Sequence, residues 1–253
     1  MSARLKPEVD GQVTGAIPGY LNEAVQSACG SVSHNLNGQK LGRKGRVTRE
    51  RILTATAELL AGPDSVPISL SAVARQASLG MTSLYNYFTD LTELLLAVLE
   101  PVMETAEPAF KAMLRDYWSD EELEKQCIAF LRAYHAFWAS HSRLLHLRNN
   151  LADNRDERML HHRVRSTQPV ICLLIAQMGG DAEDPNSPIL GMATVVMTGI
   201  ERTVTVATDR QLTELFGPSR RHYPDHYLLP EARLMELAIR DTRRRISAGE
   251  YRN

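Results

Sequence analysis

The sequence predicts an all-α protein, and three observations lead to this prediction. Apolar residues recur every three or four positions from Ile52 almost to the end of the chain, as they do along one face of a helix. Ser and Asp residues stand at several positions that are typical of helix N-caps. No segment shows the sustained alternation of apolar and polar residues that indicates a half-buried strand. A chain of 253 residues, 43% of them hydrophobic, can bury a core in one or two domains.

The composition argues against several classes of protein. The 29 Lys and Arg residues against 30 Asp and Glu give a net charge of −1, so any contact with nucleic acid needs a local basic patch. Cys29, Cys127 and Cys172 lie far apart, which disfavours a disulfide framework and fits a reducing compartment. No apolar run reaches the roughly 18 residues of a membrane span, and no secretory signal is visible. We therefore expect a soluble, cytoplasmic protein that makes no contact with a membrane.

Residues 1–39 differ in composition from the rest of the chain. They are rich in Gly, Ser, Asn and Gln and poor in large apolar residues, so we expect a disordered extension, with a short helix over 21–28 as an option. The segment Lys40–Arg51 then carries six basic residues and one acidic residue, a local charge of +5. The predicted organisation is an extension (1–39), a basic arm with the first helices (40–92) and a larger helical domain (93–253).

Caps and helix breakers predict the elements of the N-terminal part. A first helix begins after Thr48 and ends before Gly62. A second helix begins after Ser69, a good N-cap, and ends near Ala77. A three-residue turn then leads into a short helix that ends at Phe88.

Capping boxes and apolar stripes predict the longer helices that follow. Asp90 with Glu93 three residues later begins one helix, and Ser119 with Glu122 begins another. Proline residues kink or divide the helices in which they occur, at Pro101, Pro108 and Pro169. The stripes indicate helices over 123–141, 160–178, 189–206 and 228–246.

The helix, turn and short helix of Ile68–Phe88 have the order of a helix-turn-helix. Ala74 stands where the two helices would cross, and its small side chain lets them approach, while Val73, Leu79 and Leu84 can fill the space between them. The second helix of such a unit enters the major groove of DNA, where each base pair presents a distinguishable pattern of donors and acceptors. Taken alone, the segment is equally compatible with an ordinary helical hairpin.

At these residues the sequence resembles the TetR family of transcriptional regulators. The matching segments are TRERILTATAELLA (Thr48–Ala61) and ISLSAVARQASLGMTSLYNYFTDLTELLLAVLE (Ile68–Glu100). The family's recognition-helix signature, Leu-Tyr-x-(His/Tyr)-Phe, reads Leu-Tyr-Asn-Tyr-Phe over Leu84–Phe88. The resemblance implies a three-helix DNA-binding head with a helix-turn-helix, followed by a larger helical domain for ligand binding and dimerisation. Beyond residue 100 the chain resembles the family only in being helical and in its length.

The chain departs from the family pattern at two positions. Leu91 stands where the family usually has a Lys that contacts a phosphate, and Ser78 stands where a Gly is common in the turn. With the Lys absent, Ser69, Ser71 and the amides beside them are expected to contact phosphate. The basic arm is expected to supply the missing positive charge, because each Lys or Arg near phosphate releases counterions; a solvated linker is its alternative role.

The second short helix exposes residues suited to base contacts. Asn86 can pair with an adenine, and Met81 and Thr82 can touch a thymine methyl group. The predicted DNA-binding residues are Arg43, Lys44, Arg46, Arg49, Ser69, Ser71, Met81, Thr82, Ser83, Tyr85, Asn86 and Tyr87.

The resemblance also implies a homodimer in which the last two long helices of each subunit form a four-helix bundle. The helix predicted over 189–206 is apolar on nearly all sides, and Gly191, Ala193 and Gly199 permit close approach of another helix. The alternative is that this helix is central within one subunit. Two heads on a dimer would read a near-palindromic double-stranded operator with half-sites about 34 Å apart.

Aromatic side chains concentrate in the larger domain, although only 6% of the chain is aromatic. This concentration predicts an apolar cavity in which a few polar groups orient a small molecule, with plain core packing as the alternative for each residue. The predicted ligand-binding residues are Tyr117, Trp118, Phe130, Tyr134, Phe137, Trp138 and His141.

The expected function is that of a homodimeric repressor released from its operator by a small-molecule effector. The effector would bind better to a state in which the two heads are displaced. The alternatives are a ligand-independent or activating DNA-binding regulator and a helical interaction adaptor, which would leave the Leu84–Phe88 signature unexplained.

No pattern typical of an enzyme is present. The sequence lacks GxSxG, HExxH and P-loop motifs and has no GxGxxG between a strand and a helix. His161 and His162 are adjacent and would diverge on a helix, while Pro224 argues against a helical metal pair of His222 and His226. We therefore expect no enzyme activity, no metal and no cofactor.

Overall fold

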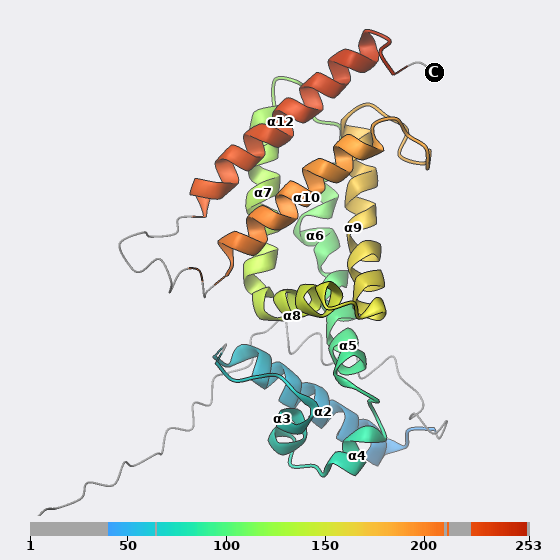
Figure 1. Ribbon diagram of the computed structural model, residues 1–253, viewed down its shortest axis with the longest axis vertical. Helices are drawn as coiled ribbons and strands as arrows, with labels where there is room; N and C mark the ends of the chain where they lie inside the picture. Colours follow the sequence, from blue (N-terminus) through green and yellow to red (C-terminus); the bar gives the residue numbers. More distant parts are fainter. Residues whose placement is uncertain (1–39, 64, 210–211, 213–223, 252–253) are drawn as a thin grey trace, which may run out of the picture. The chain divides into compact units, whose positions relative to one another are not determined.

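The computed structural model describes residues 40–63, 65–209, 212 and 224–251, and each regular element over these residues is helical (Figure 1). The prediction of an all-α chain is confirmed for this part of the chain. The extension expected over 1–39 and the optional helix over 21–28 lie outside the described residues, as do Cys29 and His222. The chain divides into two compact units between Thr89 and Asp90, three residues before the expected domain boundary.

The first unit contains three helices, α2 (Arg43–Ala61), α3 (Leu70–Gln76) and α4 (Met81–Tyr85). Helix α2 begins at Arg43, so the prediction of a separate arm with a helix start after Thr48 is wrong. The hydroxyl of Thr48 donates to the carbonyl oxygen of Lys44, one turn back, and caps nothing. Arg and Lys are good helix formers, and the helix extends through them to Gly42.

The N-cap predicted at Ser69 is confirmed, since its hydroxyl accepts a hydrogen bond from the backbone N–H of Ala72 at 3.2 Å. Helix α4 is shorter than predicted, but the N–H groups of Tyr87 and Phe88 still bond to the carbonyl oxygen of Leu84. The core of this unit is formed by fully buried side chains from all three helices and the following turn: Ile52, Leu53, Ala57, Val73, Leu84 and Phe88.

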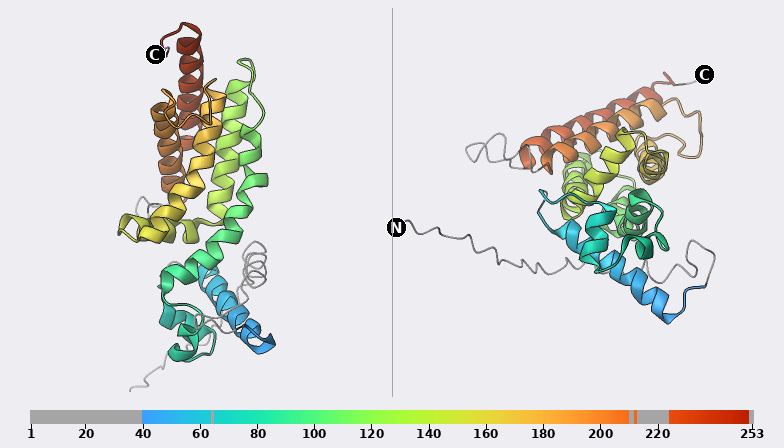
Figure 2. Two further views of the ribbon diagram at one scale, coloured as in Figure 1. Left: turned by 90° about the vertical axis from the view of Figure 1, so that its right-hand side faces the viewer. Right: turned by 60° about the horizontal axis from the view of Figure 1, so that its bottom comes forward.

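The second unit is a larger helical bundle (Figure 1). Its helices are α5 (Leu91–Glu104), α6 (Ala106–Ala109), the 3-10 helix η1 (Lys111–Leu114), α7 (Leu123–Ser140), α8 (Ser142–Asp153), α9 (Glu157–Gln177), α10 (Leu190–Ala207) and α12 (Asp225–Ser247). Helix α12 packs on α7 and α10, and α9 packs on α8 and α10 (Figure 2). Asp90 caps α5 as predicted, accepting from the N–H of Glu93 at 2.9 Å.

Two details of this unit differ from the prediction. The capping box of Ser119 and Glu122 is absent, because the backbone of Glu122 is already in the helical region and its N–H bonds to the carbonyl oxygen of Ser119 in a turn. Helix α8 was not predicted. Its buried face includes Arg148. Because Arg is a charged residue, it interrupts the apolar stripe by which a helix is recognised in the sequence.

The stripe predicted for the last helix is confirmed from Leu228 to Thr242, with Leu228, Ala232, Met235, Ile239 and Thr242 all buried, while its last member, Ile246, is half-buried. Among the helices that the structure describes, none combines the length and the apolar character needed to cross a membrane.

Candidate functional site

Helix α4 and the residues after it expose a polar surface, while one side chain of the helix is buried in the core. Leu84 is fully buried, whereas Thr82 and Ser83 on the same short helix are exposed. Tyr85, the last residue of the helix, is 49% exposed, and Asn86 directly after it is also exposed. The buried Leu84 fixes α4 in the first unit while the outer face of the helix stays open to a partner. Met81 and Tyr87 lie at the edge of this surface and are half-buried.

The first turns of α2 carry a second group of the predicted residues. Arg43, Lys44 and Arg46 are exposed. Residues 40–89 contain seven Lys or Arg against three Asp or Glu, a charge of +4 in a chain whose net charge is −1. Positive charge is therefore concentrated in the first unit.

Arg49 differs from these three arginine and lysine residues. It is only 6% exposed, and its guanidinium carbon lies 5.2 Å from the centroid of the Phe88 ring, which is itself buried. An Arg in this position covers apolar surface with its stem and stabilises the ring by a cation–π contact. This burial argues against the expected DNA contact of Arg49, because its side chain packs in the core of the unit.

The two serines at the start of α3 are close together, with 3.0 Å between their hydroxyl oxygens. The Ser69 hydroxyl is engaged as the helix cap, while Ser71 is exposed. Of the two, Ser71 is the one whose side chain faces solvent.

Arg51 is a positioning residue that sequence reasoning missed. It donates from Nε to the carbonyl oxygen of Ala77 at 3.0 Å and from Nη2 to that of Ser78 at 3.2 Å. Ser78 has a φ of 51°, the left-handed conformation that accounts for the frequent Gly at this turn. Arg51 thus fastens the turn between α3 and α4 to α2. No local pattern could reveal this contact, because its partners lie 26 and 27 residues away.

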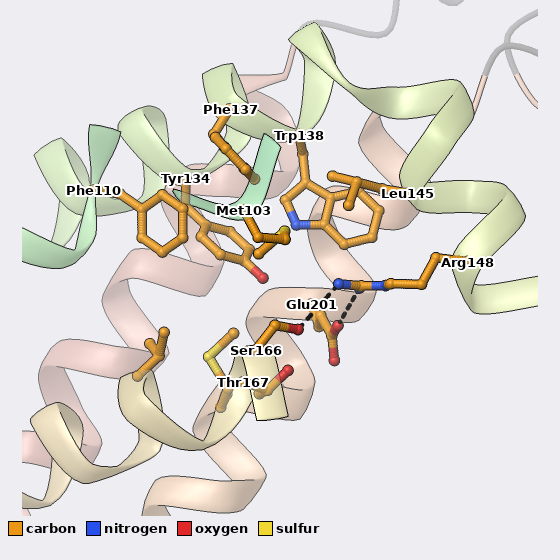
Figure 3. Close-up of a pocket in the computed structure, with 12 residues that line it drawn as sticks. Met103, Phe110, Tyr134, Phe137, Trp138, Leu145, Arg148, Ser166, Thr167 and Glu201 are labelled. Carbon is orange, nitrogen blue, oxygen red and sulfur yellow. Dashed lines mark hydrogen bonds and ion pairs between the residues drawn. The ribbon is translucent and has the colours of Figure 1, made fainter. Parts of the chain in front are cut away.

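The second unit contains a small internal cavity of about 10 Å³, enough for a single water molecule (Figure 3). Its lining comes from α5, α7, α8, α9, α10 and the residue before η1. The lining residues are Met103, Phe110, Tyr134, Phe137, Trp138, Leu145, Arg148, Ser166, Thr167, Val170, Met197 and Glu201.

Three of the seven predicted ligand-binding residues line this cavity: Tyr134, Phe137 and Trp138. Phe130 is buried beside them without lining it, and its ring stacks on Tyr134 at 6.0 Å between centroids. His141 is also buried and packs against Phe137 with 4.7 Å between ring centroids.

The remaining two predicted residues belong to other contacts. Tyr117 is 65% exposed, and its ring lies 4.1 Å from the guanidinium carbon of Arg243. Trp118 is buried in the core, where its indole N–H donates to the carbonyl oxygen of Met113 at 2.9 Å. Neither residue lines the cavity.

A buried ion pair forms the polar side of the cavity, and sequence reasoning missed it. Arg148 has a side chain only 3% exposed, and its Nη2 lies 3.1 Å from a carboxylate oxygen of Glu201. The guanidinium also donates to Ser166 and Asn149 and lies 5.7 Å from the centroid of the Trp138 ring. Figure 3 shows the Tyr134 hydroxyl pointing toward the side that carries Ser166 and Glu201.

The environment sets the protonation of these groups. Burial raises the pKa of the Tyr134 phenol, and the nearby Glu201 carboxylate raises it further, so this group is neutral and can donate a hydrogen bond. Burial lowers the pKa of Arg148, and Glu201 opposes this change; the guanidinium stays protonated because its intrinsic pKa is so high. The cavity therefore combines a compensated charge pair with neutral hydroxyl groups.

The adjacent histidines diverge as expected, with His161 exposed and His162 buried. Among the residues that the structure describes, no three His, Cys, Asp or Glu side chains gather in a way that could hold a metal ion.

Comparison with known proteins adds no assignment. No protein-family model matches the chain, and a search among curated proteins finds no match.

Proposed function

We propose that the protein is a sequence-specific DNA-binding transcriptional regulator that reads DNA through α4 and the residues after it. The observation that carries this proposal is the exposed polar surface of Thr82, Ser83, Tyr85 and Asn86 around the buried Leu84. A narrow helix with this surface fits the major groove, where Asn can pair bidentately with adenine and a Thr methyl can touch thymine. The resemblance of this segment to the TetR signature supports the same assignment.

The charge distribution supports contacts with the DNA backbone. Arg43, Lys44 and Arg46 lie on the first turns of α2 and are exposed, and residues 40–89 carry a charge of +4. Such residues provide affinity and orientation without reading sequence. They compensate for Leu91 at the position where the family usually has a Lys.

The proposal includes a homodimer formed through α10 and α12, which lie side by side in the second unit (Figures 1 and 2). Both helices expose large apolar side chains: Val195 is 68%, Leu234 60% and Leu237 45% exposed. A Cβ placed on Gly191 would meet nothing within 4 Å, so the α10 surface is open to a close neighbour. A two-fold symmetric dimer would cover these residues, since its interface uses the same surface of both subunits.

The proposal also includes release from the operator by a small molecule bound in the cavity of the second unit. Met103 lines this cavity near the end of α5, and the same helix begins directly after the first unit in the sequence. A ligand that displaces Met103 would act on this helix. A ligand-independent regulator is the second candidate function. The cavity of about 10 Å³ favours it, because this volume is too small for a small molecule unless the cavity widens.

The test is selection of bound duplexes from a random DNA library by the full-length protein, followed by affinity measurements at two salt concentrations. We expect a near-palindromic sequence whose affinity falls as salt rises. Asn86→Ala should abolish the preference at one base position per half-site, while Asn150→Ala, an exposed Asn on α8, should leave it intact. Binding without sequence preference would contradict the proposal.

A further inference from the structure

We propose that the cavity between α5, α7, α8, α9 and α10 binds an uncharged, compact ligand: a single ring or similar hydrocarbon body with one hydroxyl or carbonyl group. This inference deepens the proposed function by naming the chemical class of its effector, and it rests on that function only for the regulatory consequence of binding.

The charge of the ligand follows from the Arg148–Glu201 ion pair. Arg148 is 3% and Glu201 21% exposed, so both charges are largely removed from water and each compensates the other. Breaking a buried pair leaves an uncompensated charge in a medium of low polarity, which is strongly unfavourable. A carboxylate ligand would compete with Glu201 for the guanidinium, and an ammonium ligand would compete with Arg148 for the carboxylate. An uncharged ligand leaves the pair intact.

The body of the ligand follows from the apolar residues of the lining. Phe110, Phe137, Trp138, Val170 and Met197 line the cavity with apolar surface, and all five are buried. A cavity of this composition favours a hydrocarbon body, and aromatic walls favour a ring.

The single polar group follows from the hydroxyl groups on the polar side. The Tyr134 phenol points toward Ser166 and Glu201 (Figure 3). The hydroxyls of Ser166 and Thr167 both donate to the carbonyl oxygen of Arg163, so their remaining capacity is to accept, and Ser166 already accepts one hydrogen bond from Arg148. A ligand hydroxyl can donate to one of these oxygens, and a hydroxyl or carbonyl can accept from Tyr134.

Binding requires the cavity to widen, since about 10 Å³ holds one water molecule. An apolar cavity of roughly 150 Å³ is large enough for benzene in a model protein. Two of the lining residues, Met103 and Met197, are unbranched and can adopt other rotamers. The ligand would therefore select a wider state of the same cavity, and its apparent affinity would be reduced by the rarity of that state.

The experiment uses three probes of nearly equal size with different charge: benzyl alcohol, benzoate and benzylammonium. Each is titrated into the full-length protein, and binding is followed by tryptophan fluorescence and by the shift in melting temperature. We expect benzyl alcohol to raise the melting temperature and change the emission, and both ions to bind at least about tenfold more weakly. Trp138→Phe should remove most of the emission change and leave that of Trp118, which does not line the cavity.

Two variants reverse the charge preference if the ion pair sets it. Glu201→Gln leaves Arg148 without its counter-charge, so benzoate should gain about tenfold or more in affinity. Arg148→Met leaves Glu201 without its counter-charge, so benzylammonium should gain instead. The melting temperature of each variant without probe shows whether it is folded, and the wild-type preference stands as a separate test if one variant is not.

Three outcomes would overturn the inference: no binding of benzyl alcohol, equal binding of all three probes, or tighter binding of either ion to the wild-type protein. Operator affinity is measured in parallel. If benzyl alcohol binds and operator affinity is unchanged, the proposed ligand class is supported. The proposed release of the protein from its operator by a ligand is then refuted. If the operator is bound and benzyl alcohol is not, the inference fails and the ligand-independent regulator stands.

Discussion

Asp90 and Asp156 cap two different helices, and each also binds a side chain of the helix that the other one caps. Asp90 caps α5 and accepts from Arg158 of α9 at 2.8 Å. Asp156 caps α9 through the N–H of Met159 and accepts from the hydroxyl of Thr92 of α5 at 2.6 Å. This reciprocal arrangement, which we term the α5–α9 clasp, joins the first turns of the two helices.

The clasp should contribute measurably to the stability of the second unit. Thr92 is 5% exposed, so Thr92→Val keeps its shape while removing the hydrogen bond to Asp156. We expect a loss of about 1 kcal/mol in the free energy of unfolding, measured by urea denaturation. Thr92→Ser, which keeps the hydroxyl that donates to Asp156, is the matched control, and an equal loss there would show that the hydrogen bond is not the cause.

Acid should destabilise the protein through His162. Burial and, to a smaller extent, Arg148 lower the pKa of His162 from 6.5 to about 4, and no described residue hydrogen-bonds to its Nδ1. Because the unfolded chain takes up the proton more readily, this contribution to stability is complete above pH 6.5 and is lost as the pH falls from 6.5 to about 4. The loss is on the order of 3 kcal/mol.

The measurement is the urea midpoint of the wild type and of His162→Leu between pH 7 and 4. The variant should show a flatter dependence on pH, whereas His161→Leu, at the exposed neighbour, should retain the wild-type slope. Identical slopes for all three proteins would rule out His162 as the titrating group.

The turn between α3 and α4 should become more stable with Gly at position 78. Ser78 has a φ of 51°, which costs a residue with a side chain roughly 1–2 kcal/mol and a Gly nothing. After the entropy that Gly loses on folding, we expect Ser78→Gly to stabilise the first unit by up to about 1 kcal/mol. Ser83→Gly, within α4, should destabilise it by a comparable amount. Destabilisation by both would refute the argument.

Substitutions of Arg46 and Arg49 should change different properties of the protein: the first its affinity for DNA, the second its stability. Arg46 is exposed, so Arg46→Ala should reduce the slope of log affinity against log salt by about 1 without changing the melting temperature. Arg49 is buried against Phe88, so Arg49→Ala should lower the free energy of unfolding by about 1–2 kcal/mol. The reverse pattern would place Arg49, and not Arg46, at the DNA.

The proposed dimer should be sensitive to a charge on the exposed face of α10. Val195 is 68% exposed in the single chain, so Val195→Arg should leave the fold intact and convert the dimer to a monomer, as measured by sedimentation. Val164→Arg introduces the same change at a 54% exposed Val on α9 and should leave the dimer unchanged. A wild-type protein that sediments as a monomer would refute the dimer directly.

Local chemistry made much of the fold predictable from the sequence. The caps at Ser69 and Asp90 depend on residues three positions apart, and the stripe of α12 depends on a repeat along one helix. Helix α8 escaped prediction because a core position is held by Arg148, whose counter-charge comes from α10. The start of α2 was misplaced because the basic residues were interpreted as a separate arm, although Arg and Lys favour helix.

The candidate sites were predictable to a smaller extent. The exposure of the polar side chains of α4 was predictable from the sequence pattern of that helix. The place of Tyr134, Phe137 and Trp138 in the cavity lining was predictable from their position on one helix. Burial of Arg49 could not be inferred, because Phe88 is 39 residues away in the sequence. The Arg148–Glu201 pair, 53 residues apart, likewise has no local signature.

The Arg148–Glu201 pair also constrains how this protein can change over generations. Replacing either residue alone creates an uncompensated buried charge, so a lineage must pass through a destabilised intermediate or change both positions nearly together. Neighbouring apolar positions such as Val170 carry no such restriction and can vary one at a time. Under the ligand proposal made above, descendants of this chain should therefore alter the size of the ligands they accept gradually, and the charge of those ligands only in rare, paired steps.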